Sequence, residues 1–177
     1  MRRVSAARST AARRIAAALA LALAGALAGV HAPQPAAAGS GPGPGAPHVT
    51  PAHPAELAVE TATGVHRFRI ELRDDDAGRM TGLMHRRAMP DNHGMLFDFG
   101  REEPVAMWMK NTLLPLDMLF IRADGTILSI AENATPLSTR IIFSGGPVRY
   151  VLELNAGAAA RIGARPGDQV VHPAIRP

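Results

Sequence analysis

The sequence predicts an all-β domain, a compact antiparallel β-sandwich or barrel with one short helix near residues 77–87. Two observations lead to this class. Short runs in which apolar and polar residues alternate recur at close spacing, and residues typical of turns separate them. Most of the links between the runs look too short for crossover helices, so a βαβ order is disfavoured. The length of 177 residues allows one domain with a core, plus appendages.

The domain is expected to open with a hairpin followed by the helix. Runs 57–62 and 65–73 alternate apolar and polar residues on either side of Thr63-Gly64, which is a turn signal. The acidic triplet 74–76 then suits a helix N-terminus, and apolar residues recur at helical spacing over 77–87.

The rest of the domain is predicted to be mainly strands. Ala123-Asp124-Gly125 is a tight turn between two of them, 136–146 is irregular, and 155–163 is a turn with a short helical piece. The further strands are expected at 94–99, 104–110, 117–122, 126–131, 149–154 and 169–172.

Residues 1–38 are typical of a signal peptide. The segment is basic up to Arg14, then apolar over 15–28, which is short for a membrane span, and small residues follow. We expect cleavage within about 28–39 and a periplasmic or secreted product. Arg13-Arg14 leaves the twin-arginine route open beside general secretion, and a retained N-terminal anchor is the alternative to cleavage.

Residues 39–55 are rich in proline and glycine and are expected to form a linker to a single domain at 56–175. Five of the 19 basic residues lie in the leader, which leaves 14 basic against 15 acidic residues in the rest of the chain. This balance gives no basic face, so we expect no nucleic-acid partner. The chain has no Cys, hence no disulfide and no lipid-anchored cysteine, and we expect no stable membrane anchor after cleavage.

Candidate site residues come from one apolar stretch, 104–122, and from its surroundings. Buried charged groups need a partner or a role, and this stretch carries the only Trp and the only Lys of the chain. Trp108 and Lys110 are predicted to share a strand face and to line a pocket. The predicted ligand-binding residues are Trp108, Lys110, Asn111, Asp117, Glu153, Arg79 and Arg86.

Several interpretations of these residues stay open. The ligand would be a small anionic or sugar-like molecule, or an envelope protein; alternatively, Lys110 pairs with Asp117 or Glu153 and the network is architectural. A hydrolase-like enzyme would use Asp117 and Glu153 as acid and base, although the sequence favours a role without catalysis. A copper-handling protein would use Met80, Met84 and neighbouring His85; core packing is the simpler explanation of the methionines, and we expect no cofactor.

The motifs as a set resemble the domain-of-unknown-function 192 family. Its pattern is matched at Gly82-Leu83-Met84, Arg86, Gly94-Met95-Leu96-Phe97, Trp108-Met109-Lys110-Asn111-Thr112, Pro115-Leu116-Asp117-Met118, Val151-Leu152-Glu153-Leu154, Gly157 and Gly167-Asp168. The chain departs from it at Arg73 and Met107. The resemblance implies a compact β-sandwich or barrel with a short helix, in a family that is often exported and lacks an established activity.

Overall fold

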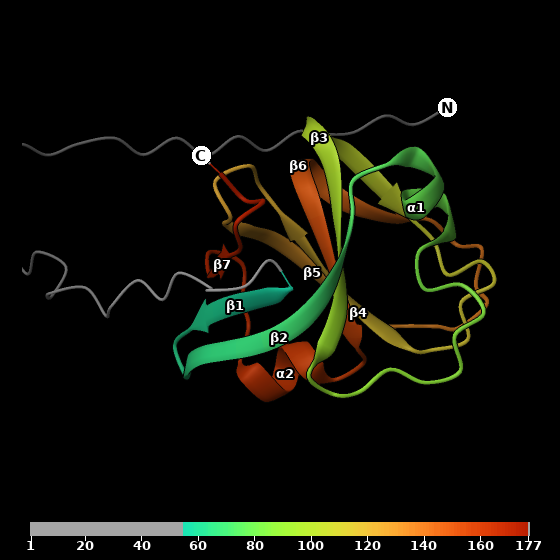
Figure 1. The fold of residues 1–177 in the computed structure, drawn as a ribbon, viewed down its shortest axis with the longest axis horizontal. Helices are drawn as coiled ribbons and strands as arrows, with labels where there is room; N and C mark the ends of the chain where they lie inside the picture. Colours follow the sequence, from blue (N-terminus) through green and yellow to red (C-terminus); the bar gives the residue numbers. More distant parts are fainter. Residues whose placement is uncertain (1–54, 177) are drawn as a thin grey trace, which may run out of the picture. The chain divides into compact units, whose positions relative to one another are not determined.

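The computed structural model describes residues 55–176, so the predicted signal peptide and all but the last residue of the predicted linker lie outside the described residues. Seven strands and two short helices follow one another (Figure 1). Their bounds are β1 Glu56–Thr61, β2 Gly64–Arg73, α1 Asp76–Thr81, β3 His93–Met107, β4 Leu116–Ile121, β5 Ile127–Ala134, β6 Ile142–Asn155, α2 Ala158–Ile162 and β7 Gln169–Val171.

The strands form one sheet in the order β5-β4-β6-β3-β2-β1-β7, which confirms the predicted β class. One pair departs from the antiparallel prediction: β2 and β3 are parallel, with Ile70 opposite Gly94 and Leu72 opposite Leu96. The connection between them contains α1, so the disfavoured βαβ unit does occur once. Only six of its residues are helical, but the whole connection is long enough to cross the sheet.

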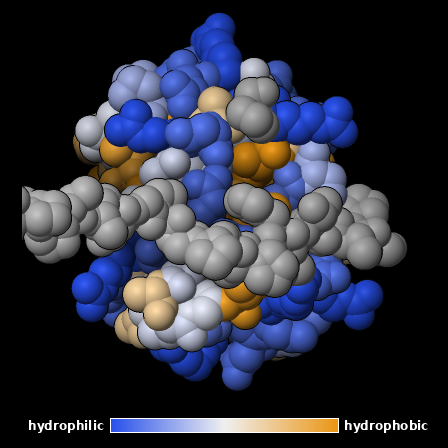
Figure 2. Space-filling model, turned by 90° about the vertical axis from the view of Figure 1, so that its left-hand side faces the viewer, coloured by the Kyte–Doolittle hydropathy of each residue, from blue (hydrophilic) through white to orange (hydrophobic). Residues whose placement is uncertain are grey.

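The sheet curls until its two edge strands meet at one end. The Val170 N–H donates to the Gly125 carbonyl at 2.8 Å, and the Ile127 N–H donates to the Asp168 carbonyl at 2.9 Å. Figure 1 shows β7 beside β1 at the left of the view and α1 at the upper right. On the β1–β7 side, Figure 2 shows hydrophilic side chains around the periphery, with separate apolar patches between them.

Two predicted strands are one strand in the structure. The predicted strand 94–99 and residues 104–107 of the predicted strand 104–110 belong to β3, whereas 108–110 lie in the following loop. β3 stays paired with β6 across register shifts between Asp98 and Glu103 and between Pro104 and Ala106. At the first shift Gly100 has φ +79° and its N–H donates to the Asp98 carboxylate at 2.7 Å. A bulge of this kind interrupts the alternation without ending the pairing, which explains why the pattern predicted two strands.

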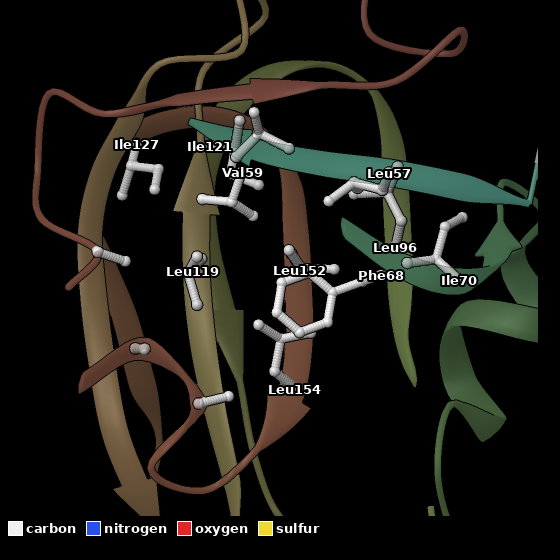
Figure 3. Packing of buried hydrophobic residues seen from close by; sticks show 14 of the residues in the cluster. Leu57, Val59, Phe68, Ile70, Leu96, Leu119, Ile121, Ile127, Leu152 and Leu154 are labelled. Atoms are coloured by element: carbon white, nitrogen blue, oxygen red, sulfur yellow. The ribbon is translucent and has the colours of Figure 1, made fainter. Parts of the chain in front are cut away.

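The concave side of the sheet encloses the first core. Leucine, isoleucine, valine and phenylalanine side chains from all seven strands contribute to it, and those labelled in Figure 3, from β1 to β6, point toward one another. On β6, Leu152 and Leu154 are fully buried in this core, and α2 adds Ala158, Ala159 and Ile162. We call this cluster the inner core.

A second cluster lies on the other face of the same strands. Its fully buried members include Met95 of β3 and Met118 of β4, and the segments 82–92 and 108–115 cover it. We call it the outer core. The helix predicted over 77–87 stops at Thr81, because Gly82 takes φ +47° and its N–H closes the last turn on the Gly78 carbonyl. Residues 83–87 therefore pass over the outer core as an irregular segment.

Candidate functional site

A cleft of about 690 Å³ opens over the outer core, between α1, β3 and the loop that follows β3. This size lies within the range of small-molecule sites. Apolar side chains dominate its walls: Leu83 and Phe97 are buried, whereas Trp108 is 45% exposed at the rim. Its polar and charged lining residues are Arg79, Thr81, His85, Lys110, Asn111, Thr112 and Glu153.

Glu153 is the buried carboxyl of this cleft. Register places it beside Met95 of β3 and Met118 of β4, on the outer-core face of β6, and its exposed fraction is only 4%. Burial alone raises the pKa of Glu153 from the ordinary 4.5 to about 8. Within residues 55–176 this carboxyl has no side-chain hydrogen bond and no ion pair, while every fully enclosed side-chain nitrogen or oxygen there has a partner. The Glu153 carboxyl must therefore meet the open space of the cleft.

Lys110 and Trp108 form one wall of the cleft together. The Lys110 Nζ lies 5.1 Å from the centroid of the Trp108 ring, within the range of a cation–π contact. β3 ends at Met107, so the two residues are joined by this contact rather than by a shared strand face. Lys110 is exposed and pairs with no carboxylate among the described residues. The architectural alternative, in which Lys110 neutralises Asp117 or Glu153, is wrong.

Asn111 ties the loop after β3 to the segment after α1. Its backbone is left-handed, with φ +56°, and its carbonyl accepts the His85 N–H at 2.9 Å. The Asn111 side-chain amide also lies 3.8 Å from the Met84 sulfur. These contacts join two irregular segments that both line the cleft.

The two predicted arginines have different surroundings. Arg79 lines the cleft, donates to the Asp98 carbonyl at 2.6 Å, pairs with Asp76, and lies 5.8 Å from the Phe99 ring centroid. Arg86 lies outside the cleft lining and makes a bidentate ion pair with Glu71. This contact is the main cause that lowers the pKa of Glu71. Arg79 therefore lines the cleft, whereas Arg86 lies outside its lining and is held by Glu71.

Asp117 is not a cleft residue. It is opposite Leu154 in the β4–β6 register and so points to the inner-core side of the sheet, opposite to Glu153. Its two carboxylate oxygens accept the backbone N–H groups of Asn133 and Ala159, each at 2.9 Å. Asp117 thus anchors α2 and the end of β5, and the proposed acid–base pair with Glu153 is not formed.

Sequence reasoning placed Glu153, Lys110, Asn111, Trp108 and Arg79 in one site, and the structure brings these five together. Around these five residues, the sequence did not predict which apolar and soft side chains line the cleft. These are Met80, Leu83, Met84, His85, Phe97, Phe99 and Met107. Met80, Met84 and His85 had been considered only as a copper site, and core packing also explains the density of methionines. No three His, Cys, Asp or Glu side chains cluster at metal-binding spacing within residues 55–176.

Comparisons with known proteins give a family but no activity. The model of the DUF192 family, described as "Uncharacterized ACR", matches residues 58–172. The chain is 57% identical to a Sinorhizobium meliloti 1021 protein described as a "putative transcription regulator", with a TM-score of 0.64 and coverage of 65% of this chain and 90% of that one. It is 39% identical to a Novosphingobium aromaticivorans DSM 12444 protein of unknown function, with the same TM-score and coverage of 65% and 82%.

No functionally curated protein matches the chain significantly. Within the described residues, neither helix has the length and apolar character that crossing a membrane requires.

Proposed function

The chain belongs to the DUF192 family, and we propose that it is a small-ligand-binding module whose site is the cleft over the outer core. One observation carries the proposal: the cleft has apolar walls and a buried carboxyl, Glu153, without a partner in the described residues. Leaving a buried polar group unpaired costs stability. Ligand sites usually combine an apolar surface with a few polar groups, and the cleft around Glu153 has this composition.

The rim of the cleft supplies the second argument. Trp108 presents a half-exposed ring, and Lys110 and Arg79 place positive charge nearby. Aromatic rings beside polar groups give flat contact area together with directional contacts. The indole also provides a means of detection, because Trp108 is the only tryptophan of the chain.

We further propose that the protein acts in the periplasm or outside the cell. This rests on the basic and then apolar leader of residues 1–38. A tagged full-length chain should be recovered from the periplasmic or medium fraction, with a new N-terminus within about 28–39 by mass spectrometry. Recovery of the unprocessed chain from the cytoplasm alone would contradict export.

The binding proposal is tested by Trp108 emission and thermal shift across a panel of small amines, carboxylates, sugars and aromatic compounds. A true ligand changes both signals in the wild type. Ala106→Arg, at an exposed lining position, should abolish the response by filling the cleft. Ala62→Arg, in the β1–β2 turn, is the matched control and should respond like the wild type. A panel without any response, or unchanged binding by Ala106→Arg, would overturn the proposal.

Copper handling is a second candidate, because the cleft brings together the thioethers of Met80, Met84 and Met107 with the imidazole of His85. Thioethers are soft ligands and favour Cu(I). A copper protein should bind one Cu(I) per chain and lose it in the Met80→Leu plus Met84→Leu variant. Retention of Cu(I) by that variant would place the ion elsewhere.

A role in transcription, as described for the Sinorhizobium meliloti relative, has weaker support. Outside the leader the chain carries 14 basic and 15 acidic residues. The two helices of the described part have six and five residues, whereas DNA readers of the helix-turn-helix type need a longer helix to enter the major groove. Salt-dependent retention of DNA by the domain would favour that role instead.

A further inference from the structure

We propose that Glu153 is the recognition group for a protonated amine, so that the cleft selects small molecules carrying an ammonium group on an apolar stem. This inference rests on the proposed binding function and names its ligand class. A carboxyl that is 4% exposed, unpaired within the described residues and open to the cleft is a fixed acceptor for a cationic donor.

The walls around Glu153 suit the stem of such a ligand. Leu83, Phe97 and Met107 line the cleft together with Glu153, and the strand neighbours Met95 and Met118 are apolar. An ammonium group that enters this environment loses its water, so it needs a charged partner there. Among the cleft residues only Glu153 carries an acidic group.

The other titratable groups that face the cleft are Arg79 from α1, His85 from the following segment and Lys110 from the loop after β3. Arg79 is already engaged by Asp76 and two backbone carbonyls, and Lys110 lies over Trp108. The segments that pack against Glu153 from β3 and β4 contribute uncharged methionines. A ligand cation therefore has one acidic group to bind, and an anionic outer end would meet the basic rim.

Binding is coupled to one proton. In the free protein at neutral pH the Glu153 carboxyl is mostly protonated, because burial holds its pKa near 8. When an ammonium group binds, the carboxyl O–H bond breaks, the electron pair stays on oxygen, and the proton passes to the buffer. Amine affinity should thus rise about tenfold per pH unit between pH 6 and pH 8 and then level off.

The experiment compares three probes with the same aromatic stem: phenethylamine, phenethyl alcohol and hydrocinnamate. Each is titrated against the full mature chain by Trp108 emission and by calorimetry in two buffers of different ionisation enthalpy. We expect the amine to bind at least tenfold more tightly than the alcohol or the carboxylate at pH 8, with proton release below that pH. Glu153→Gln should weaken the amine roughly 10- to 100-fold and leave the alcohol within about twofold.

Glu132→Gln removes an exposed acid on β5 outside the cleft lining and is the matched control; it should bind the amine like the wild type. If Glu153→Gln does not fold, the wild-type pH profile and proton release decide alone. Preferred binding of the alcohol or carboxylate, or an amine affinity without pH dependence, would overturn the inference and leave the binding function standing. If neither these probes nor any compound of the panel binds, both the amine inference and the proposed binding function are overturned.

Discussion

Each face of the sheet buries one acidic side chain, and the two carboxyl groups differ in their hydrogen bonding. On the inner-core face, Asp117 is fully buried and accepts two backbone N–H groups at 2.9 Å. On the outer-core face, Glu153 is nearly as buried and has no such partner in the described residues. Buried polar groups that serve the fold are normally satisfied within it. The contrast assigns Asp117 to architecture and supports the proposal that Glu153 binds a ligand.

The strongest test of the architectural half is Asp117→Ala. The variant leaves the N–H groups of Asn133 and Ala159 without their acceptors in a buried place. We expect a loss of roughly 3–5 kcal/mol in the free energy of unfolding, or about 10–20 °C in melting temperature. Urea denaturation measures it. A loss below about 1 kcal/mol would show that the fold does not depend on this carboxylate.

The pH dependence of stability tests whether the Glu153 carboxyl is buried without a partner. Because the pKa of Glu153 is about 8 in the folded chain and 4.5 ordinarily, the folded state binds the proton more tightly than the unfolded state. The contribution of Glu153 to the free energy of unfolding is therefore complete below pH 4.5 and is lost as the pH rises through about 8. Between pH 5 and pH 8 the free energy of unfolding should fall by about 3 kcal/mol.

Glu153→Gln should abolish that fall, since the amide does not ionise. Denaturation of the two proteins at pH 5, 6.5 and 8 gives the comparison directly. A wild type as stable at pH 8 as at pH 5 would mean that Glu153 ionises freely, and that the cleft is more polar than its walls indicate.

Glu71, a partly exposed carboxylate with an ion-pair partner, should change stability with pH in the opposite direction to Glu153. Glu71 has its pKa lowered, chiefly by the hydrogen bond from Arg86, so this contribution is present above pH 4.5 and is lost as the pH falls. Both side chains are partly exposed, and solvent screens the pair. Arg86→Met should cost only about 1 kcal/mol at pH 7, and ligand binding in the cleft should not change. Weaker binding would place Arg86 in the site after all.

The smallest effect is expected for Lys110→Met. Lys110 is exposed and contacts the Trp108 ring instead of a buried acid, and such a contact contributes roughly 0.5–1 kcal/mol. The melting temperature should move by no more than a few degrees, while the emission of Trp108 should change because its charged neighbour is gone. A fall comparable to that of Asp117→Ala would reveal a partner for the amine.

The sequence was informative where a local pattern decides the structure. Alternation predicted most of the strands, and the unusual position of charged residues in apolar runs picked out both Asp117 and Glu153. Which face each would occupy depends on the β4–β6 register, and a shift of one residue reverses the face. The register is a long-range property, so the sequence pattern could not tell the satisfied acid from the unsatisfied one.

The cleft itself arises from irregular structure that propensity describes poorly. Gly82 ends α1 early, and the left-handed backbones of His85 and Asn111 turn two segments over the sheet. The pattern at 77–87 predicted a longer helix because the apolar residues kept helical spacing. Those residues instead cover the outer core and line the cleft, a tertiary outcome that overrides local preference.

The pairing of β1 with β7 makes completion of the sheet depend on the C-terminal end of the domain. The first strand of the domain finds one of its two neighbours only in the last strand, and β7 also joins the sheet to the start of β5. Closing so long a loop is slow compared with forming hairpins. Until residues 169–171 are available, β1 keeps one unpaired edge, and such free strand edges favour aggregation. A ribosome that stops short of Gln169 would therefore release a chain that a protease or chaperone recognises as unfinished.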